Sequence, residues 1–221
     1  MAQCTPLEDL TPGQPPVSGF LHRADAPVSE ALVLTHGAGG NCRAPLLVAL
    51  AEALATRGIS VLRCDLPFRQ RRPSGPPSPA SAQDDQAGLR RAAELMRSEC
   101  KGRVFLGGAS YGGRQASMLL AAEPAAADAL LLLSYPLHPP GKPQQLRTKH
   151  LPDVRVPTLF VSGTKDPFGT IAELDAARRL IPAPTELVAI EGAGHSLLTK
   201  TNKGELISAV VDNFLRLVAA R

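Results

Sequence analysis

The stretch VFLGGASYGG, residues 104–113, decides the fold of this chain. It places an apolar run directly before Gly108-Ala109-Ser110-Tyr111-Gly112, and a helix-like segment follows at residues 113–122. A Gly-x-Ser-x-Gly sequence between a strand and a helix is typical of a nucleophile elbow, a sharp turn that holds its serine strained and pointing outward. The glycines leave room where the strand and helix backbones pass close together. Ser110 is therefore a candidate nucleophile, and the rest of the chain must supply its partners.

Apolar runs typical of buried strands alternate along the chain with segments typical of helices. This alternation predicts an α/β fold, a mostly parallel sheet with helices on both faces. Most runs are continuously apolar, as expected of strands that are buried on both faces. The expected strands are residues 31–35, 59–64, 104–106, 129–134, 158–161 and 186–190. The expected helices are residues 45–57, 81–100, 113–122, 171–180 and 203–219.

Local signals refine these elements. The residue pairs with the spacing of a helix-capping box are Ser81 with Asp84, Thr170 with Glu173, and Asn202 with Glu205. Residues 67–79 contain five prolines, so we expect a surface loop there.

Composition narrows the class of protein. A chain of 221 residues with 44% hydrophobic and 20% charged residues suits a soluble globular protein with a sizeable core. The net charge of +4 is made of scattered charges of both signs with no interleaved aromatic residues, so no nucleic-acid partner is expected. Residues 1–13 lack the apolar core of a signal peptide, and no run is long enough to span a membrane. We therefore expect a cytoplasmic protein with no membrane partner.

The four cysteines, Cys4, Cys42, Cys64 and Cys100, show no CxxC pairing and no histidines at ligand spacing. We expect free, buried thiols rather than a disulfide framework or a zinc site. The sequence thus predicts no metal and no cofactor.

A serine nucleophile needs a histidine to accept its proton and a carboxylate to orient that histidine. Asp166 follows the expected strand 158–161, and His195 follows the expected strand 186–190. Loops that leave the carboxyl ends of parallel strands open on the same side of the sheet. Ser110, Asp166 and His195 are therefore expected to meet there as a catalytic triad.

Other interpretations of these residues stay open. Asp166 precedes a proline and could cap a helix, although Thr170 and Glu173 already serve that purpose, and His195 could be a solvated loop residue. His36 is a second candidate base, but no carboxylate is in evident reach, which favours a structural hydrogen bond. Asp65 is the alternative acid.

An oxyanion formed during acyl transfer needs backbone N–H donors. One donor is expected from Tyr111, the residue after the nucleophile. The loop His36-Gly37-Ala38-Gly39-Gly40 would supply the other, with Ala38 as the first choice and Gly39 as the second.

The same glycines resemble part of a dinucleotide-binding fingerprint, with Asp65 at the end of the next strand. Cys42 stands where that fingerprint requires its third glycine, which argues against a dinucleotide site. A phosphate-binding P-loop is excluded because residues 107–114 lack its Lys-Ser/Thr pair.

Five segments carry a resemblance to a known family: HGAGG (36–40), LRCDLPFR (62–69), GGASYGGR (107–114), LFVSGTKDPFG (159–169) and EGAGHS (191–196). In this order they resemble the α/β-hydrolase superfamily, in which the triad also runs Ser, Asp, His along the chain. More narrowly, they resemble its small dienelactone-hydrolase-like branch, and within it the group that includes testis-expressed protein thirty and the hydrolase-like subunit of the non-specific-lethal chromatin complex.

The resemblance implies Ser110 as nucleophile, Asp166 as orienting acid, His195 as general base, and Ala38 with Tyr111 as oxyanion donors. Dienelactone hydrolases use a cysteine nucleophile, so their substrate is not carried over. The resemblance also implies an N-terminal extension at residues 1–16 and a single hydrolase domain at residues 17–221.

Many enzymes of this superfamily carry a helical cap between the sixth and seventh strands. Here 22 residues, rich in proline, separate Ser134 from Pro157, and a cap domain does not fit in them. An uncapped site suits small or exposed esters.

Arginines close to the expected site could favour an anionic substrate, or could form a solvated basic rim. They are Arg69, Arg71, Arg72 and Arg114; Arg69 and Arg114 are the candidate substrate-binding residues.

The sequence therefore predicts a serine hydrolase that cleaves a small-molecule ester through an acyl-enzyme. Two alternatives remain: acyl transfer or cleavage of another bond by the same triad, and a hydrolase-like interaction module without turnover.

Overall fold

The strands form one sheet in the order β1-β2-β4-β3-β5-β6-β7-β8 in a computed structural model that describes residues 3–24 and 30–220. Neighbouring strands run parallel from β4 to β8, whereas β1 and β2 pair antiparallel with each other and β2 pairs antiparallel with β4. The strands are β1 Cys4–Asp9, β2 Val17–His22, β3 Glu30–Thr35, β4 Ile59–Cys64, β5 Val104–Ala109, β6 Leu130–Leu133, β7 Thr158–Gly163 and β8 Thr185–Ile190. The predicted mostly parallel α/β fold is confirmed.

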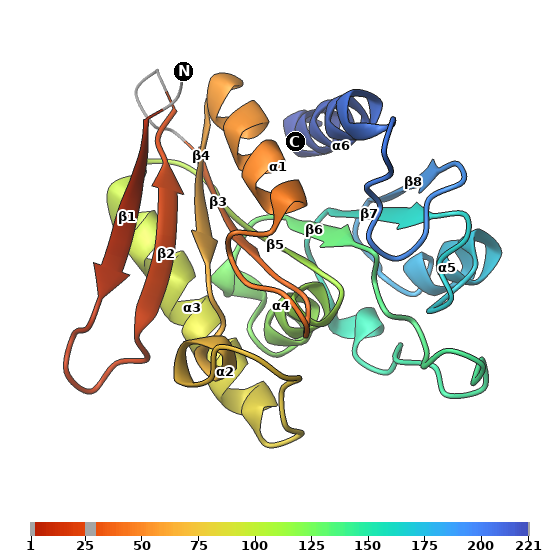
Figure 1. Cartoon of the computed structure of the whole chain (residues 1–221), viewed down its shortest axis with the longest axis horizontal. Coiled ribbons are helices and arrows are strands. Elements are labelled where there is room, and N and C mark those ends of the chain that lie inside the picture. The colour runs from red at the N-terminus through yellow and green to blue at the C-terminus, as the bar shows by residue number, and fades with distance from the viewer. Residues whose placement is uncertain (1–2, 25–29, 221) are drawn as a thin grey trace.

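Helices cover both faces of the sheet, as Figure 1 shows. The helices are α1 Pro45–Thr56, α2 Pro67–Arg71, α3 Ser81–Glu99, α4 Tyr111–Ala122, α5 Ile171–Arg178 and α6 Lys203–Ala219, with 3-10 turns η1 Pro124–Ala126 and η2 Leu151–Asp153. Residues of β3 alternate between two buried clusters. Ala31 and Val33 pack with α3 and α4, whereas Leu32 and Leu34 pack with α1 and α6. The continuous apolar runs of the sequence reflect this burial on both faces.

The sheet contains two strands, β1 and β2, that the sequence pattern did not indicate. In β1, exposed and half-buried residues alternate, and Pro6 interrupts the run. Proline is tolerated there because β1 is an edge strand. Strand β1 lies within the predicted N-terminal extension, residues 1–16. The structure does not describe residues 1–2, at the start of that extension, or residue 221, at the end of the predicted domain.

Only one predicted capping box is present. Thr170 and Glu173 form both of its hydrogen bonds at the start of α5. The prediction for Ser81 was wrong, because Ala80 occupies the N-cap of α3 and the Ser81 hydroxyl bonds the Ser78 hydroxyl at 3.0 Å. The prediction for Asn202 was also wrong: its side chain bonds the preceding loop, accepting from Thr199 N–H and donating to the Leu197 carbonyl, which leaves it unable to cap α6.

The predicted proline-rich loop starts later than expected. Pro67–Arg71 forms the short helix α2, because a proline fits the first helical turn, where its missing N–H has no helical partner to lose. The segment is irregular only from Arg72 onward.

The connection between β6 and β7 is short and fully described. The turn η2 is its only helical element, so the expected absence of a cap domain is confirmed. In the described part of the chain, no helix has the length and apolar character needed to cross a bilayer.

Phe214 tests how α6 is held on the sheet. Its fully buried ring meets the Phe105 ring edge to face, with centroids 5.5 Å apart. We expect Phe214→Ala to lower the free energy of unfolding by about 3–5 kcal/mol, since it leaves a cavity. Leu10→Ala is the matched control: Leu10 is 65% exposed, and its loss should change stability by less than about 0.5 kcal/mol. Equal effects in urea titrations would contradict the packing described.

Candidate active site

Ser110 lies at the turn between β5, which ends at Ala109, and α4, which begins at Tyr111. Its backbone has φ 49° and ψ −114°, a strained conformation for a residue with a side chain. The turn needs glycine at two positions, because the neighbouring backbones touch there. A Cβ on Gly108 would lie 2.7 Å from the Gly113 nitrogen, and one on Gly112 would overlap the His36 carbonyl. These backbone contacts explain why both positions need glycine, as the sequence predicted.

The structure brings Ser110, His195 and Asp166 together from three loops at the carboxyl edge of the sheet. His195 Nε2 lies 2.9 Å from Ser110 Oγ. His195 Nδ1 lies 2.8 Å and 3.0 Å from the two carboxylate oxygens of Asp166. A carboxylate facing Nδ1 holds the proton on that nitrogen, so Nε2 is free to accept the serine proton.

Packing holds the acid and the histidine in this geometry. The Asp166 side chain is 1% exposed, and its Oδ1 also accepts the Phe168 N–H at 2.9 Å. Thr170, and not Asp166, caps α5. The Phe168 ring packs on the His195 imidazole, with centroids 4.2 Å apart. Of the alternatives left open by the sequence, a helix cap for Asp166 and a solvated loop position for His195 do not match these contacts.

Unpaired amides lie in the two segments next to Ser110, the loop after β3 and the start of α4. The N–H groups of Ala38, Gly39 and Tyr111 have no hydrogen-bond acceptor within residues 3–24 and 30–220. Ala38 and Tyr111 line the same cavity as Ser110. Tyr111 is also the first residue of α4, where the helix dipole favours negative charge. This arrangement can stabilise an oxyanion next to Ser110.

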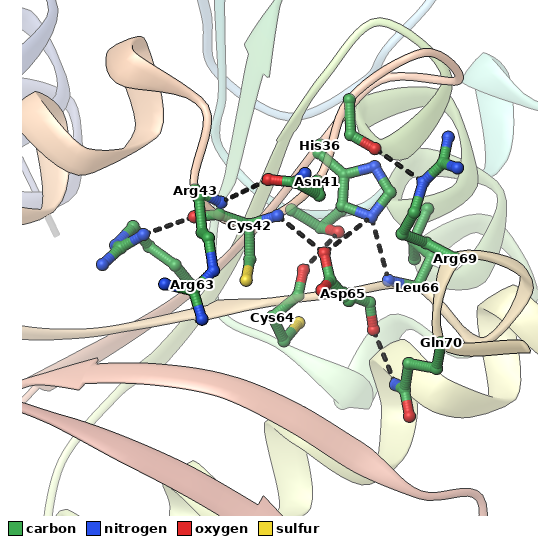
Figure 2. A network of polar contacts seen from close by, with 12 residues as sticks. His36, Asn41, Cys42, Arg43, Arg63, Cys64, Asp65, Leu66, Arg69 and Gln70 are labelled. Atoms are coloured by element: carbon green, nitrogen blue, oxygen red, sulfur yellow. Dashed lines mark hydrogen bonds and ion pairs between the residues drawn. The ribbon is translucent and has the colours of Figure 1, made fainter. Parts of the chain in front are cut away.

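A buried network holds the loop that carries Ala38, as Figure 2 shows. His36 Nε2 accepts the Leu66 N–H at 3.1 Å, so its Nδ1 carries the proton and donates to the Gly37 carbonyl at 2.8 Å. Burial lowers the pKa of His36, which favours this neutral form. The predicted structural hydrogen bond for His36 is thus present.

Asp65 corrects one detail of the sequence interpretation, which placed no carboxylate within reach of His36. Asp65 Oδ1 lies 3.3 Å from His36 Nε2, because the two residues follow the neighbouring parallel strands β4 and β3. The same oxygen accepts the Cys42 N–H at 2.6 Å. Asp65 is therefore part of the loop network, whereas Asp166 is the carboxylate that contacts His195.

Arg69 does not lie at the substrate cavity, contrary to the sequence interpretation. Its guanidinium is buried and donates to the carbonyls of Ala38 at 2.9 Å and Gly40 at 2.8 Å, and to those of Arg72 and Gly75. These carbonyls belong to the loop that carries Ala38 and to the segment that follows α2. Arg69 therefore ties the two segments together.

The other arginines differ in position. Arg71 pairs with Asp84 on the surface, and Arg72 donates to the Pro76 carbonyl. Only Arg114 of the four predicted arginines lines the cavity, where a residue that the sequence did not indicate, Arg147, joins it. Arg147 lies in the irregular β6–β7 connection, which has no periodicity to mark it.

Two cavities meet at Ser110. The wider one, of about 560 Å³, lies over the start of α4 and is lined by Tyr111, Arg114, Arg147 and Phe168 among others. The second, of about 340 Å³, is lined mainly by apolar residues of α1 and the His195 loop, and His195 itself faces it.

The cysteines lie outside the Ser110 cavities and are free thiols, as predicted. Cys42, Cys64 and Cys100 are buried, but Cys4 is exposed because it lies on the edge strand β1, so the expectation of burial was wrong for Cys4. Burial raises the pKa of the Cys42 thiol to about 11. In the described residues, no group of three or more histidine, cysteine or acidic side chains is placed to hold a metal ion.

The Arg69 contacts predict a loss of serine reactivity when they are removed. We expect Arg69→Met to slow labelling of Ser110 by a fluorophosphonate about tenfold or more, because the loop with Ala38 loses its support and the oxyanion its alignment. Arg71→Met makes the same change on the same helix but removes only a surface ion pair, and should label at the parent rate. Equal labelling rates for the two variants would contradict this role of Arg69.

Comparisons with known proteins agree with this architecture. A family model described as an alpha/beta hydrolase domain matches residues 28–220. A curated relative, epoxide hydrolase A of Mycobacterium tuberculosis, is 39% identical over 59 residues, which are 27% of this chain and 18% of that protein.

Solved structures share the fold over nearly the whole chain. A dienelactone hydrolase from Anabaena variabilis has a TM-score of 0.77 at 21% identity, covering 98% of both chains. Est1E from Butyrivibrio proteoclasticus has a TM-score of 0.76 at 16% identity, covering 97% of this chain and 99% of its own. A serine hydrolase without a lid from Xanthomonas campestris has a TM-score of 0.72 at 20% identity, covering 97% of this chain and 94% of its own.

Proposed function

Because the chain belongs to the alpha/beta hydrolase family, we propose that it is a metal-free serine hydrolase that cleaves a small or exposed carboxylic ester. One observation carries the proposal: the hydrogen-bonded series Asp166–His195–Ser110 lies beside unpaired amides at the mouth of two cavities. The lidless protein from Xanthomonas campestris has the same fold, and its name describes a serine hydrolase.

In the proposed reaction, the Ser110 hydroxyl attacks the ester carbonyl while His195 Nε2 takes its proton. Asp166 keeps the imidazole oriented and stabilises its positive charge. The amides of Ala38 and Tyr111 donate to the oxyanion of the tetrahedral intermediate. Stabilisation of this charge by preorganised donors is usually the largest single contribution to the rate. The intermediate expels the alkoxide, which receives its proton from His195, and leaves an acyl-enzyme.

Deacylation uses the same groups in reverse order. A water molecule attacks the acyl carbon as His195 accepts one of its protons, and Ser110 recovers that proton when the carboxylic acid leaves. No cap domain covers the site in the described residues, so we expect water to reach the acyl-enzyme directly. This access favours hydrolysis over transfer of the acyl group to another acceptor.

Labelling separates an enzyme from an interaction module. We expect a fluorophosphonate to modify the parent protein at Ser110 and to leave Ser110→Ala unmodified, as measured by intact mass. Ser117→Ala is the control, because Ser117 lies on the same helix but its hydroxyl is buried against Arg114 and His150; it should label like the parent. A parent protein that does not react would contradict the proposal and favour the interaction module.

Asp166→Asn tests the orienting acid. An asparagine removes the charge that holds the His195 tautomer, and we expect kcat on a nitrophenyl ester to fall about 10³–10⁴-fold with the fold intact. Asp212→Asn removes a carboxylate of a surface ion pair and should leave kcat within about twofold. A decrease of less than tenfold in Asp166→Asn would remove the acid from the mechanism.

A further inference from the structure

Two arginines in the wider cavity have no acidic partner. Arg114 follows Ser110 by one helical turn of α4, and Arg147 faces the same cavity from the β6–β7 connection. Neither guanidinium takes part in any ion pair of the described residues. Most other arginines of the structure are paired, so these two are a local excess of positive charge.

The hydrogen bonds of the pair are also incomplete. Arg114 Nε is buried and has no acceptor in the part of the chain that the structure describes. Arg147 uses one nitrogen on the Pro136 carbonyl at 3.1 Å. Its backbone is fixed, since its N–H donates to the Leu137 carbonyl and its carbonyl accepts the Tyr135 hydroxyl. Arg147 is thus presented to the cavity by a fixed loop, with donors left over.

The surroundings make these charges costly without an anion. Among the residues that the structure describes, no Asp or Glu lines the wider cavity, and much of its wall is apolar, with Pro77, Met118 and Phe168. Burial and the charge of Arg114 together lower the pKa of Arg147. The same two causes lower the pKa of His150, which bonds Ser117 behind α4, to about 4, so His150 is neutral and adds no charge. Two partly buried like charges are stabilised when an anion binds between them.

We propose that Arg114 and Arg147 bind an ionised carboxylate on the acyl part of the substrate, so that the site selects half-esters of dicarboxylic acids. This inference rests on the proposed ester hydrolysis and names its substrate class. Guanidinium groups suit this role because their paired N–H donors match the two oxygens of a carboxylate.

The position of His195 assigns the acyl part to the wider cavity. The departing alkoxide must receive its proton from His195, and His195 lines the second cavity and not the wider one. The alcohol part therefore extends toward the second, apolar cavity. The acyl chain then extends past Ala38 and Tyr111 into the cavity that holds the two arginines.

A matched pair of esters tests the inference. The mono-4-nitrophenyl ester of adipic acid carries a free carboxylate, and capping that carboxylate as a methyl ester gives a neutral substrate with the same acyl chain. Hydrolysis consumes one water and releases nitrophenol with adipate or its monomethyl ester. We expect the parent protein to favour the charged ester at least about tenfold in kcat/KM, as charge-assisted hydrogen bonds would give.

Variants assign that preference to the pair. Arg147→Gln and Arg114→Gln should each reduce the ratio of the two kcat/KM values about tenfold, and Arg147→Lys should keep part of it. Arg155→Gln removes the same charge from an exposed site outside the cavity and should leave the ratio unchanged. Hydrolysis of both esters with no preference, or an equal decrease for both esters in the variants, would overturn the inference while leaving the proposed function intact.

Direct binding separates the two proposals. Adipate titrated into Ser110→Ala in a calorimeter should bind. Adding Arg147→Gln to that variant should raise the Kd for adipate about tenfold. Failure of fluorophosphonate labelling and of both ester assays would reject the hydrolase but not this anion site. The absence of saturable adipate binding would reject the anion site, whatever the activity.

Discussion

The structure of the site depends on one close approach of backbones. Strand β5 and helix α4 pack so tightly that no Cβ fits at Gly108, and the end of β3 approaches α4 so closely through the His36 carbonyl that no Cβ fits at Gly112. This contact fixes the strained conformation of Ser110 and places the loop with Ala38 beside it. Main chain therefore positions Ser110, the proposed nucleophile, and the amides proposed to donate to the oxyanion, and the side chains of His195 and Asp166 complete the arrangement.

Several polar side chains near the site serve the backbone rather than a ligand. Arg69, His36 and Asp65 bind carbonyls and N–H groups of the loop between β3 and α1 and of the segment after β4. A loop with three glycines has few side chains with which to pack, so it needs such hydrogen bonds to keep one conformation. Arg114 and Arg147 differ from these residues because they line a cavity, and Arg114 Nε has no acceptor among the described residues.

The sequence predicted the centre of the molecule better than its margins. Five of the six predicted strands are buried on both faces and appear as continuous apolar runs, whereas the sixth, β8, is a half-buried edge strand. Strand β1 was missed because an edge strand with Pro6 has no such run. The sequence predicted that Ser110, Asp166 and His195 would meet, because loops after parallel strands lie on the same side of a sheet. The role of Arg69 and the position of Arg147 could not be predicted, since a guanidinium that binds carbonyls and one that faces a cavity have the same sequence signature.

The strand order also has a consequence for folding. Ala31 of β3 pairs with Val104 of β5, so the loop with Ala38 and the turn with Ser110 become neighbours only after a chain segment of about 70 residues has closed. Such distant pairings form slowly compared with local helices. The proposed site around Ser110 therefore forms only after β3 and β5 have paired in the middle of the sheet.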